Sequence, residues 1–220
     1  MIGIVDYDAG NLTSVQRALE YLGIPSRMVS TGDDLRRATV GRSVGNRPAV
    51  AELERIIFPG VGHAGTAMET LQARGLDVAL RDVFERGIPI LGICLGAQIV
   101  LSRSEEGDTP CLDLIPGCSP RFDLADRSLK VPHMGWNAVR IRQPHPVLKD
   151  VQDEDEFYFV HAYYPLPSQA SRVFATCDYG GPFPAVIGDS NLVATQFHPE
   201  KSGRVGLALL RSFCEWDGVA

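Results

Sequence analysis

The sequence has no excess of positive charge and no long apolar run. Its 220 residues carry a formal net charge of −6, whereas a nucleic-acid-binding surface must be basic to neutralise phosphates. No apolar segment reaches the roughly 20 residues that a membrane-spanning helix needs. Asp6 and Asp8 stand where a signal peptide would carry basic side chains. We therefore expect a cytoplasmic protein whose partners include neither nucleic acid nor a membrane.

The sequence also lacks a C-x-x-C pair, the usual spacing of structural zinc ligands. Cys111 and Cys118 leave open a disulfide or a metal site, but cytosolic thiols are usually reduced and we expect neither. Repeats, low-complexity tracts and a clear linker are missing too, so the length predicts one domain over residues 1–220. The cysteines number five and are widely spaced: Cys94, Cys111, Cys118, Cys177 and Cys214.

The first half of the sequence alternates short apolar runs with segments of helical periodicity. This alternation predicts an α/β fold with an open, mainly parallel sheet flanked by helices. Residues 30–52 are polar and rich in glycine and arginine, and we expect a mobile surface insertion there. Strands are expected at residues 2–5, 24–29, 55–58 and 88–93. Helices are expected after Asn11, which can cap the first of them, at residues 66–74 and 76–86, and from Cys94 to about Leu101.

The second half has a different pattern, in which short apolar segments follow one another with brief turns. This pattern predicts an added antiparallel portion and a last helix that packs back on the sheet. The strands are expected at residues 130–142, 156–162, 173–178 and 192–197, and the helix at residues 203–216.

Cys94 lies between Gly92 and Gly96, where the strand at residues 88–93 gives way to a helix. Reactive groups of open α/β sheets lie at the carboxyl ends of strands, and G-x-C-x-G is the thiol counterpart of the G-x-S-x-G nucleophile elbow. The positive end of the helix favours a thiolate, and the Leu95 amide would face an oxyanion. A buried structural cysteine is the alternative, so a nucleophile requires a base and a group that orients it.

The segment TQFHPEKS, residues 195–202, contains such a pair in His198 and Glu200. Side chains two residues apart leave an extended backbone on the same face, and we expect Pro199 to keep the segment extended. A carboxylate beside an imidazole holds its tautomer and stabilises its protonated form. A histidine and a glutamate at the surface end of a strand are the alternative. No other histidine in the sequence has a carboxylate at this spacing.

A glycine-rich turn follows the strand at residues 55–58, in the segment FPGVGHAG. Gly60 and Gly62 permit positive φ, so backbone N–H groups near Val61 could face a ligand and stabilise an oxyanion. An ordinary strand-to-helix turn is the alternative. The segment is not a phosphate loop, because no G-K-[ST] follows it.

In this order, the three segments resemble the class I, or triad, glutamine amidotransferases. Further segments fall in a family order across nearly the whole chain: IGIVDYDAGNLTSV, FPGVG, GICLGAQ, EEG, LIPG, VPHMGWN, FYFVHAYY and TQFHPEKSG. With these segments the chain more closely resembles the glutaminase subunits of imidazole glycerol phosphate synthases, which serve histidine biosynthesis. The resemblance implies a flavodoxin-like three-layer fold of the class I amidotransferase type.

The resemblance implies that the chain hydrolyses glutamine to glutamate and ammonia through a thioester, without a metal or organic cofactor. Cys94 would be the nucleophile, His198 the general base and acid, and Glu200 the residue that orients His198. The oxyanion site would comprise Gly60, Val61, Gly62 and Leu95, and the glutamine site Gln98, Ala162 and Tyr163.

The resemblance also implies a partner, because the family passes its ammonia through a channel to a (β/α)₈ barrel cyclase in a heterodimer. The cyclase makes imidazole glycerol phosphate and an aminoimidazole carboxamide ribotide. The residues implied at that interface are Asn11, Pro132, His133, Met134, Trp136, Tyr158, His161 and Lys201.

Four other functions stay open from the sequence. The chain could serve another acceptor, as the glutaminases of sugar amidotransferases do, or act as a stand-alone γ-glutamyl hydrolase. It could also be a scaffold subunit with a vestigial site, although Cys94, His198 and Glu200 are all present. A redox or stress protein with a reactive elbow cysteine would need neither H-P-E nor Gln98.

Overall fold

The computed structural model describes the backbone of residues 1–40, 42–44, 47–50 and 52–219, and the side chains of residues 1–40 and 52–219. One large sheet of nine strands runs through this part of the chain, in the order β11-β10-β13-β14-β15-β6-β5-β1-β2. Its parallel half consists of β1 (Ile2–Val5), β2 (Ser26–Val29), β5 (Arg55–Gly60), β6 (Ile90–Cys94) and β15 (Leu192–Thr195). Its antiparallel half consists of β10 (His133–Ile141), β11 (Asp155–His161), β13 (Val173–Asp178) and β14 (Pro182–Asp189).

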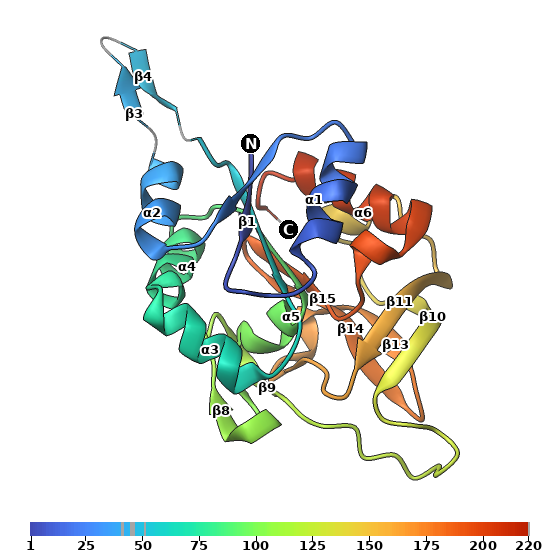
Figure 1. The fold of residues 1–220 in the computed structure, drawn as a ribbon. Helices are drawn as coiled ribbons and strands as arrows, with labels where there is room; N and C mark the ends of the chain where they lie inside the picture. Colours follow the sequence, from blue (N-terminus) through green and yellow to red (C-terminus); the bar gives the residue numbers. More distant parts are fainter. Residues whose placement is uncertain (41, 45–46, 51, 220) are drawn as a thin grey trace.

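Helices cover both faces of this sheet and make a three-layer molecule (Figure 1). One face carries α1 (Leu12–Tyr21) and α6 (Gly203–Glu215). The other face carries α2 (Gly32–Val40), α3 (Ala64–Ala73), α4 (Leu76–Glu85) and the short α5 (Leu95–Ile99). The mainly parallel sheet, its helices and the antiparallel portion are thus as the sequence predicts. Among the described residues, no helix has the length and apolarity to cross a membrane.

Smaller elements complete the chain. A four-stranded sheet has the order β12-β9-β7-β8, and β3 and β4 form a separate two-stranded sheet. The bounds of these strands are β3 Arg42–Val44, β4 Arg47–Val50, β7 Leu101–Ser104, β8 Thr109–Pro110, β9 Ile115–Ser119 and β12 Leu166–Pro167. The 3₁₀ turns are η1 (Glu106–Asp108), η2 (Pro146–Leu148), η3 (Ala170–Arg172) and η4 (Pro199–Lys201).

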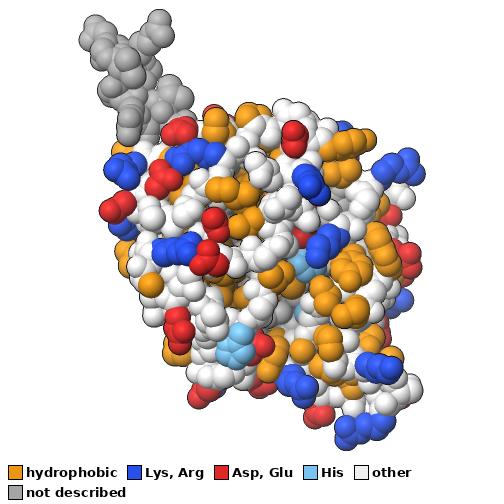
Figure 2. Space-filling model, viewed as in Figure 1, with side chains coloured by type: hydrophobic (Ala, Val, Ile, Leu, Met, Phe, Trp, Pro, Cys, Tyr) orange, Lys and Arg blue, Asp and Glu red, His pale blue; other side chains and the backbone are white. Residues whose placement is uncertain are grey.

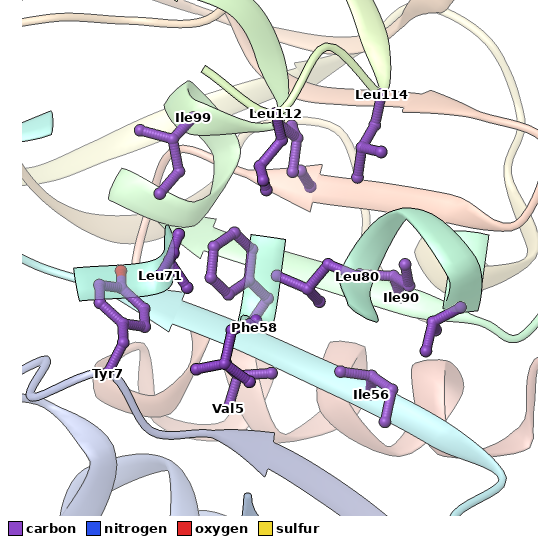
Figure 3. Packing of buried hydrophobic residues seen from close by; sticks show 14 of the residues in the cluster. Val5, Tyr7, Ile56, Phe58, Leu71, Leu80, Ile90, Ile99, Leu112 and Leu114 are labelled. Atoms are coloured by element: carbon purple, nitrogen blue, oxygen red, sulfur yellow. The ribbon is translucent and has the colours of Figure 1, made fainter. Parts of the chain in front are cut away.

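The two faces of the sheet bury separate hydrophobic clusters, because the central strands are apolar on both sides. Every residue of β6 is buried, as expected of a parallel strand covered by helices on each face. Phe58 of β5 lies in the middle of one cluster, with Val5 and Ile56 on one side and Ile99 on the other (Figure 3). Burial of each such side chain stabilises the fold by about 1.5–3 kcal/mol. The sheet edge that carries the sequence motifs is therefore rigidly supported.

Two expectations about local structure need correction. Part of the expected surface insertion at residues 30–52 is helix α2, which packs against α4 and buries Leu35 completely. Polar residues dominate α2, but Leu35, Ala38 and Thr39 share one face of the helix and are buried. The helix after Cys94 ends at Ile99 rather than near Leu101, where β7 begins. All five cysteines are free thiols, including Cys111 and Cys118.

Candidate active site

Three strand ends bring the separate sequence motifs to one edge of the sheet. β5 ends at Gly60, which pairs with Cys94 at the end of β6. On the other side of β6, Ile93 pairs with Thr195 at the end of β15, directly before the segment with His198. Parallel strands end at the same edge of a sheet, so residues about 35 and 100 positions apart in sequence meet here.

Cys94 is held on a strained turn between β6 and α5. Its backbone has φ 56° and ψ −107°, a region that L-residues rarely adopt. Gly92 and Gly96 make the turn possible, since a Cβ on Gly92 would lie 2.9 Å from the Cβ of Ala194 and one on Gly96 would clash with the Phe58 carbonyl. Strain of this kind costs of order 1–3 kcal/mol and concentrates at functional sites. The geometry is that of the predicted nucleophile elbow.

His198 and Glu200 form a buried pair. The Nδ1 atom of His198 lies 2.7 Å from Oε1 of Glu200, and neither side chain is exposed to solvent. Glu200 is a carboxylate acceptor, so Nδ1 carries a proton. The Nε2 atom of His198 is buried and has no hydrogen-bond partner among the described residues. That nitrogen is the one left to exchange a proton with a neighbouring group.

The electrostatics of His198 favour its protonated form. Burial lowers the pKa of His198, but the negative charges of a Cys94 thiolate and of Glu200 outweigh burial and raise it above its usual value. A protonated histidine beside a cysteine can give up a proton from Nε2, and a cysteine with such a base can act as a nucleophile. The site can therefore attack a carbonyl carbon and return a proton to the leaving group.

The backbone that carries this pair differs from the expectation. Pro199 does not keep the segment extended, because it begins the 3₁₀ turn η4, in which Glu200 is the second residue. Proline is tolerated in the first turn of a helix, where its missing N–H would have no partner in any case. His198 itself is extended, with φ −98° and ψ 94°. The turn, rather than strand alternation, folds the carboxylate back onto the imidazole.

Asn11 has a different position from the two that the sequence suggested. Its side chain makes no capping bond at the start of α1, and only 5% of the residue is exposed. Its Nδ2 atom instead donates to Oε1 of Glu200 at 3.0 Å. Asn11 therefore extends the row Cys94, His198, Glu200 by one more residue rather than lying open on a surface.

A cavity of about 320 Å³ opens beside Cys94, within the size range of small-molecule sites. It contains three of the four predicted oxyanion residues and all three predicted glutamine-binding residues. Gly60 is not in its wall, because it is packed against Tyr7, Leu95 and Gly96 inside the fold. The lining residues are Val61, Gly62, Cys94, Leu95, Gln98, Glu106, Pro132, Val160, His161, Ala162 and Tyr163.

Two polar residues of this site were not predicted from the sequence. Gln196 is completely buried, and its Nε2 atom donates to the Cys94 sulfur at 3.7 Å. It lies two positions before His198 in TQFHPE, a spacing that could have signalled a shared face. Glu106 lines the cavity and accepts a 2.7 Å hydrogen bond from the Ala64 amide at the start of α3. Its signal was the acidic pair in the EEG motif.

The predicted partner-facing residues divide into two groups. Met134 and Trp136 are 64% and 56% exposed on β10, and Trp136 packs edge-on against Tyr158 of β11 at 6.1 Å between ring centroids. Figure 2 shows hydrophobic side chains gathered over this part of the molecule. Pro132 and Lys201 are exposed as well, and the Lys201 ammonium lies 5.9 Å from the centroid of the Tyr158 ring.

The second group is buried, which contradicts the expectation of a surface role. His133 and His161 are only 3% and 5% exposed, and Asn11 is similarly enclosed. The two histidines are opposite one another on β10 and β11 and pack against each other and against Phe122, and His161 also lines the cavity. We refer to the accessible residues Pro132, Met134, Trp136, Tyr158 and Lys201 as the β10–β11 patch.

Comparisons with known protein families agree with this geometry. A family model described as glutamine amidotransferase class-I matches residues 3–215. The chain is 49% identical over 219 residues to the imidazole glycerol phosphate synthase subunit HisH of Nitratidesulfovibrio vulgaris, covering 97% of this chain and 95% of that protein. It is 45% identical to the protein of the same name from Moorella thermoacetica, covering 97% and 94%.

Solved structures show the same fold at much lower sequence identity. A crystal structure of a glutamine amidotransferase superposes with a TM-score of 0.71 at 19% identity and covers 99% of both chains. The structure of PurLQS from Thermotoga maritima matches with a TM-score of 0.69 at 17% identity, covering 97% of both chains. These similarities support the arrangement of layers, and the site itself is defined by the distances above.

Proposed function

The chain belongs to the class I glutamine amidotransferases and, within them, to the HisH subunits of imidazole glycerol phosphate synthase, and from that premise we propose that its Cys94, His198 and Glu200 hydrolyse glutamine to supply ammonia for histidine biosynthesis. The observation that carries this proposal is the buried His198–Glu200 pair at 2.7 Å, set beside a cysteine on a strained turn that opens into the cavity. We further propose that residues 1–220 act as one amidotransferase domain in the cytoplasm.

The reaction begins when the Cys94 thiolate attacks the side-chain amide carbon of glutamine. Electrons move to the amide oxygen, which is stabilised by backbone N–H groups at Leu95 and near Val61. His198 then gives its Nε2 proton to the amide nitrogen, so the C–N bond breaks and ammonia leaves. The product on the enzyme is a γ-glutamyl thioester of Cys94.

Water completes the cycle. His198, now neutral, accepts a proton from a water molecule at Nε2 while the water oxygen attacks the thioester carbon. The C–S bond breaks, the thiolate is restored and glutamate departs. Glu200 keeps the imidazole in the Nδ1–H form throughout, and Asn11 holds Glu200 in place. The chemistry needs no metal and no organic cofactor.

We propose that the β10–β11 patch receives the partner, a (β/α)₈ barrel cyclase. Ammonia released into water would be diluted and protonated, so a glutaminase that feeds a synthase benefits from a closed path to the acceptor. The patch fits a protein interface because it combines exposed aromatic and methionine side chains with a lysine at its edge. Pro132 belongs both to the patch and to the cavity wall, so the two are adjacent.

Glutamate release from glutamine tests the proposal. The chain is assayed alone and then with its cognate cyclase and a ribulotide analogue, with Cys94→Ala as the control. We expect low activity alone, strong stimulation in the complex and complete loss in the variant. High activity that the cyclase does not change would instead support a stand-alone hydrolase, and activity that survives Cys94→Ala would refute the proposed nucleophile.

A further inference from the structure

Two buried histidines that the proposed reaction does not use lie next to the cavity. His133 and His161 face one another across β10 and β11, with His133 Nδ1 and His161 Nε2 only 3.0 Å apart. The other nitrogen of each ring is also engaged. His133 Nε2 lies 3.3 Å from Nδ2 of Asn137, and His161 Nδ1 lies 2.8 Å from the Tyr163 carbonyl oxygen. All four ring nitrogens therefore belong to one continuous row of hydrogen bonds.

The direction of this row is set by the backbone around Asn137. The Oδ1 atom of Asn137 accepts from the Ala138 amide at 2.9 Å, and its Nδ2 atom donates to the Asp178 carbonyl at 2.8 Å. The amide cannot be reversed without placing donor against donor and acceptor against acceptor. Its NH₂ group must therefore donate to His133 Nε2, so that the proton of His133 is on Nδ1.

The Tyr163 end of the row requires the hydrogen bonds to run in the same direction. If His133 Nδ1 donates, His161 Nε2 must accept, so the proton of His161 is on Nδ1 as well. That proton points to the Tyr163 carbonyl, which is an obligatory acceptor. One arrangement of hydrogens thus satisfies both ends, and adding a proton to either ring would bring two donors together. Burial agrees with this, because it lowers the pKa of His133 to about 4 and that of His161 to about 3.

The row continues from Tyr163 to the nucleophile. Gln98 Nε2 donates one hydrogen to the same Tyr163 carbonyl at 2.8 Å and the other to Oε1 of Gln196 at 3.0 Å. Gln196 in turn points its Nε2 atom at the Cys94 sulfur. The Tyr163 carbonyl therefore accepts a hydrogen bond from His161 and another from Gln98. Through Gln98 and Gln196 it connects the two histidines to the Cys94 sulfur.

The surroundings of the histidines are stiff. His133 stacks on Tyr179 with 4.0 Å between ring centroids and on Phe159 with 4.9 Å, and Phe122 and Phe183 close the box around both rings. Packed aromatic rings resist rotation of the imidazoles. A fixed row of this kind can hold a backbone carbonyl more firmly than a lone hydrogen bond does.

We propose that His133 and His161 are positioning residues of the glutamine site, which fix the Tyr163 carbonyl and through it the side chains of Gln98 and Gln196 beside Cys94. The inference rests on the proposed glutaminase function and deepens it. The row also reaches β10 at Asn137 and His133, in the same strand that exposes Met134 and Trp136 in the β10–β11 patch. A shift of β10 would therefore move the Tyr163 carbonyl through the two histidines.

The tautomers give a test that does not depend on activity. Nitrogen NMR of the whole chain labelled with ¹⁵N-histidine distinguishes a protonated Nδ1 from a protonated Nε2. At neutral pH we expect both His133 and His161, assigned by loss of signal in single variants, to be neutral with the proton on Nδ1. An Nε2–H form of either ring, or a charged ring, would overturn the row. This holds even if the chain proves not to hydrolyse glutamine.

Kinetics test the positioning role in the complex with the cyclase. His161→Phe keeps the size of the ring but loses both hydrogen bonds. We expect KM for glutamine to rise about tenfold, which corresponds to about 1.4 kcal/mol. His161→Asn, whose Nδ2 atom can take the place of the ring Nδ1, is expected to restore KM to within about threefold. The alkylation rate of Cys94 by iodoacetamide should change in parallel.

His145→Phe is the matched control. His145 is 5% exposed, as His161 is, and packs against the rings of Phe174 and Trp216, while its Nδ1 atom accepts from the Val147 amide. It has no hydrogen bond to Gln98 or Tyr163 among the described residues. We expect it to lower unfolding stability while leaving KM unchanged. If His161→Phe behaves like His145→Phe, losing stability with an unchanged KM, the two histidines are core residues only and the proposal is wrong.

Discussion

Glu200 accepts two hydrogen bonds on one oxygen, and the second donor distinguishes this site from a bare triad. His198 Nδ1 and Asn11 Nδ2 both reach Oε1, at 2.7 and 3.0 Å. The carboxylate has no contact with solvent, so each donor that compensates its charge matters more than it would at a surface. The orientation of the imidazole thus depends on a residue at the opposite end of the chain.

Replacing Asn11 tests this dependence. Asn11→Leu removes the donor at similar volume, and we expect kcat for glutamine hydrolysis in the complex to fall about tenfold. A hydrogen bond to a charged group contributes about 1.5–3 kcal/mol, of which part is lost when Glu200 turns away from His198. KM for glutamine and affinity for the cyclase should stay unchanged. Steady-state kinetics and a binding titration measure the three quantities.

Thr13→Val, an exposed substitution in the same helix, provides the control and should have no effect. A variant Asn11→Leu that binds the cyclase more weakly but turns over normally at saturation would return Asn11 to the interface and remove it from the triad.

The proposed triad could be picked out in the sequence because its signals are local. Gly92 and Gly96 flank Cys94, and His198 and Glu200 share one short segment. The contact between Asn11 and Glu200 spans 189 residues, and that between Gln196 and Cys94 spans 102. No local pattern encodes such pairs. The same holds for His133 and His161, which a motif marks as important while only the folded strands show that they point inward.

At the scale of elements, the pattern of apolar residues predicted the bounds of some helices and strands closely, whereas composition hid two others. β1 and β13 have the predicted bounds, and α4 differs by one residue. β14 was missed because Pro182 and Pro184 argue against a strand, although it pairs on both sides. Helix α2 was missed because its polar composition hid the few apolar residues that it buries. In each case tertiary packing overrode composition.

The short turn η2 gives a prediction about pH. His145 precedes it, and its Nδ1 atom accepts from the Val147 amide at 3.1 Å, so protonation would set donor against donor. Burial lowers the pKa of His145 to about 4. The unfolded chain takes up a proton near pH 6.5, so His145 costs stability as pH falls from about 6.5 to 4 and has no such effect above 6.5.

His145→Asn retains an acceptor for Val147 and does not titrate. We expect the unfolding free energy of the native chain to fall relative to this variant by about 1.4 kcal/mol per pH unit below pH 6.5, and by about 3 kcal/mol in total. Urea denaturation of both proteins between pH 7.5 and 4.5 measures the difference. Parallel pH curves would show that His145 is protonated in the folded state.

On the scale of the whole molecule, the two halves of the large sheet have different tasks. The parallel half places Cys94 at its carboxyl edge, as the strand order of an open α/β sheet dictates. The antiparallel half supplies one wall of the cavity through residues 160–163 and carries the β10–β11 patch on its outer side. The site therefore lies between the carboxyl edge of the parallel strands, which carries Cys94, and the antiparallel strands, which carry the exposed β10–β11 patch.

Trp136 is the residue through which this arrangement can be tested. Trp136 is 56% exposed and packs edge-on against Tyr158. Removing its side chain should therefore change the unfolding free energy of the free chain by no more than about 0.5 kcal/mol. Tryptophans at the centre of an interface, in contrast, often contribute 2 kcal/mol or more, which is about thirtyfold in affinity. Trp136→Ala should therefore weaken cyclase binding about thirtyfold while Cys94 alkylation and thermal stability of the free chain stay unchanged.

Tyr21→Ala supplies the comparison, because Tyr21 is 79% exposed at the far end of α1 and outside the patch. Isothermal titration with the cyclase separates the two variants: Tyr21→Ala should bind as the native chain does. Equal affinity for all three proteins would mean that the partner docks elsewhere. In that case the exposed aromatic side chains of β10 and β11 would need another occupant, and the link from β10 through His133 to the glutamine site would no longer begin at an interface.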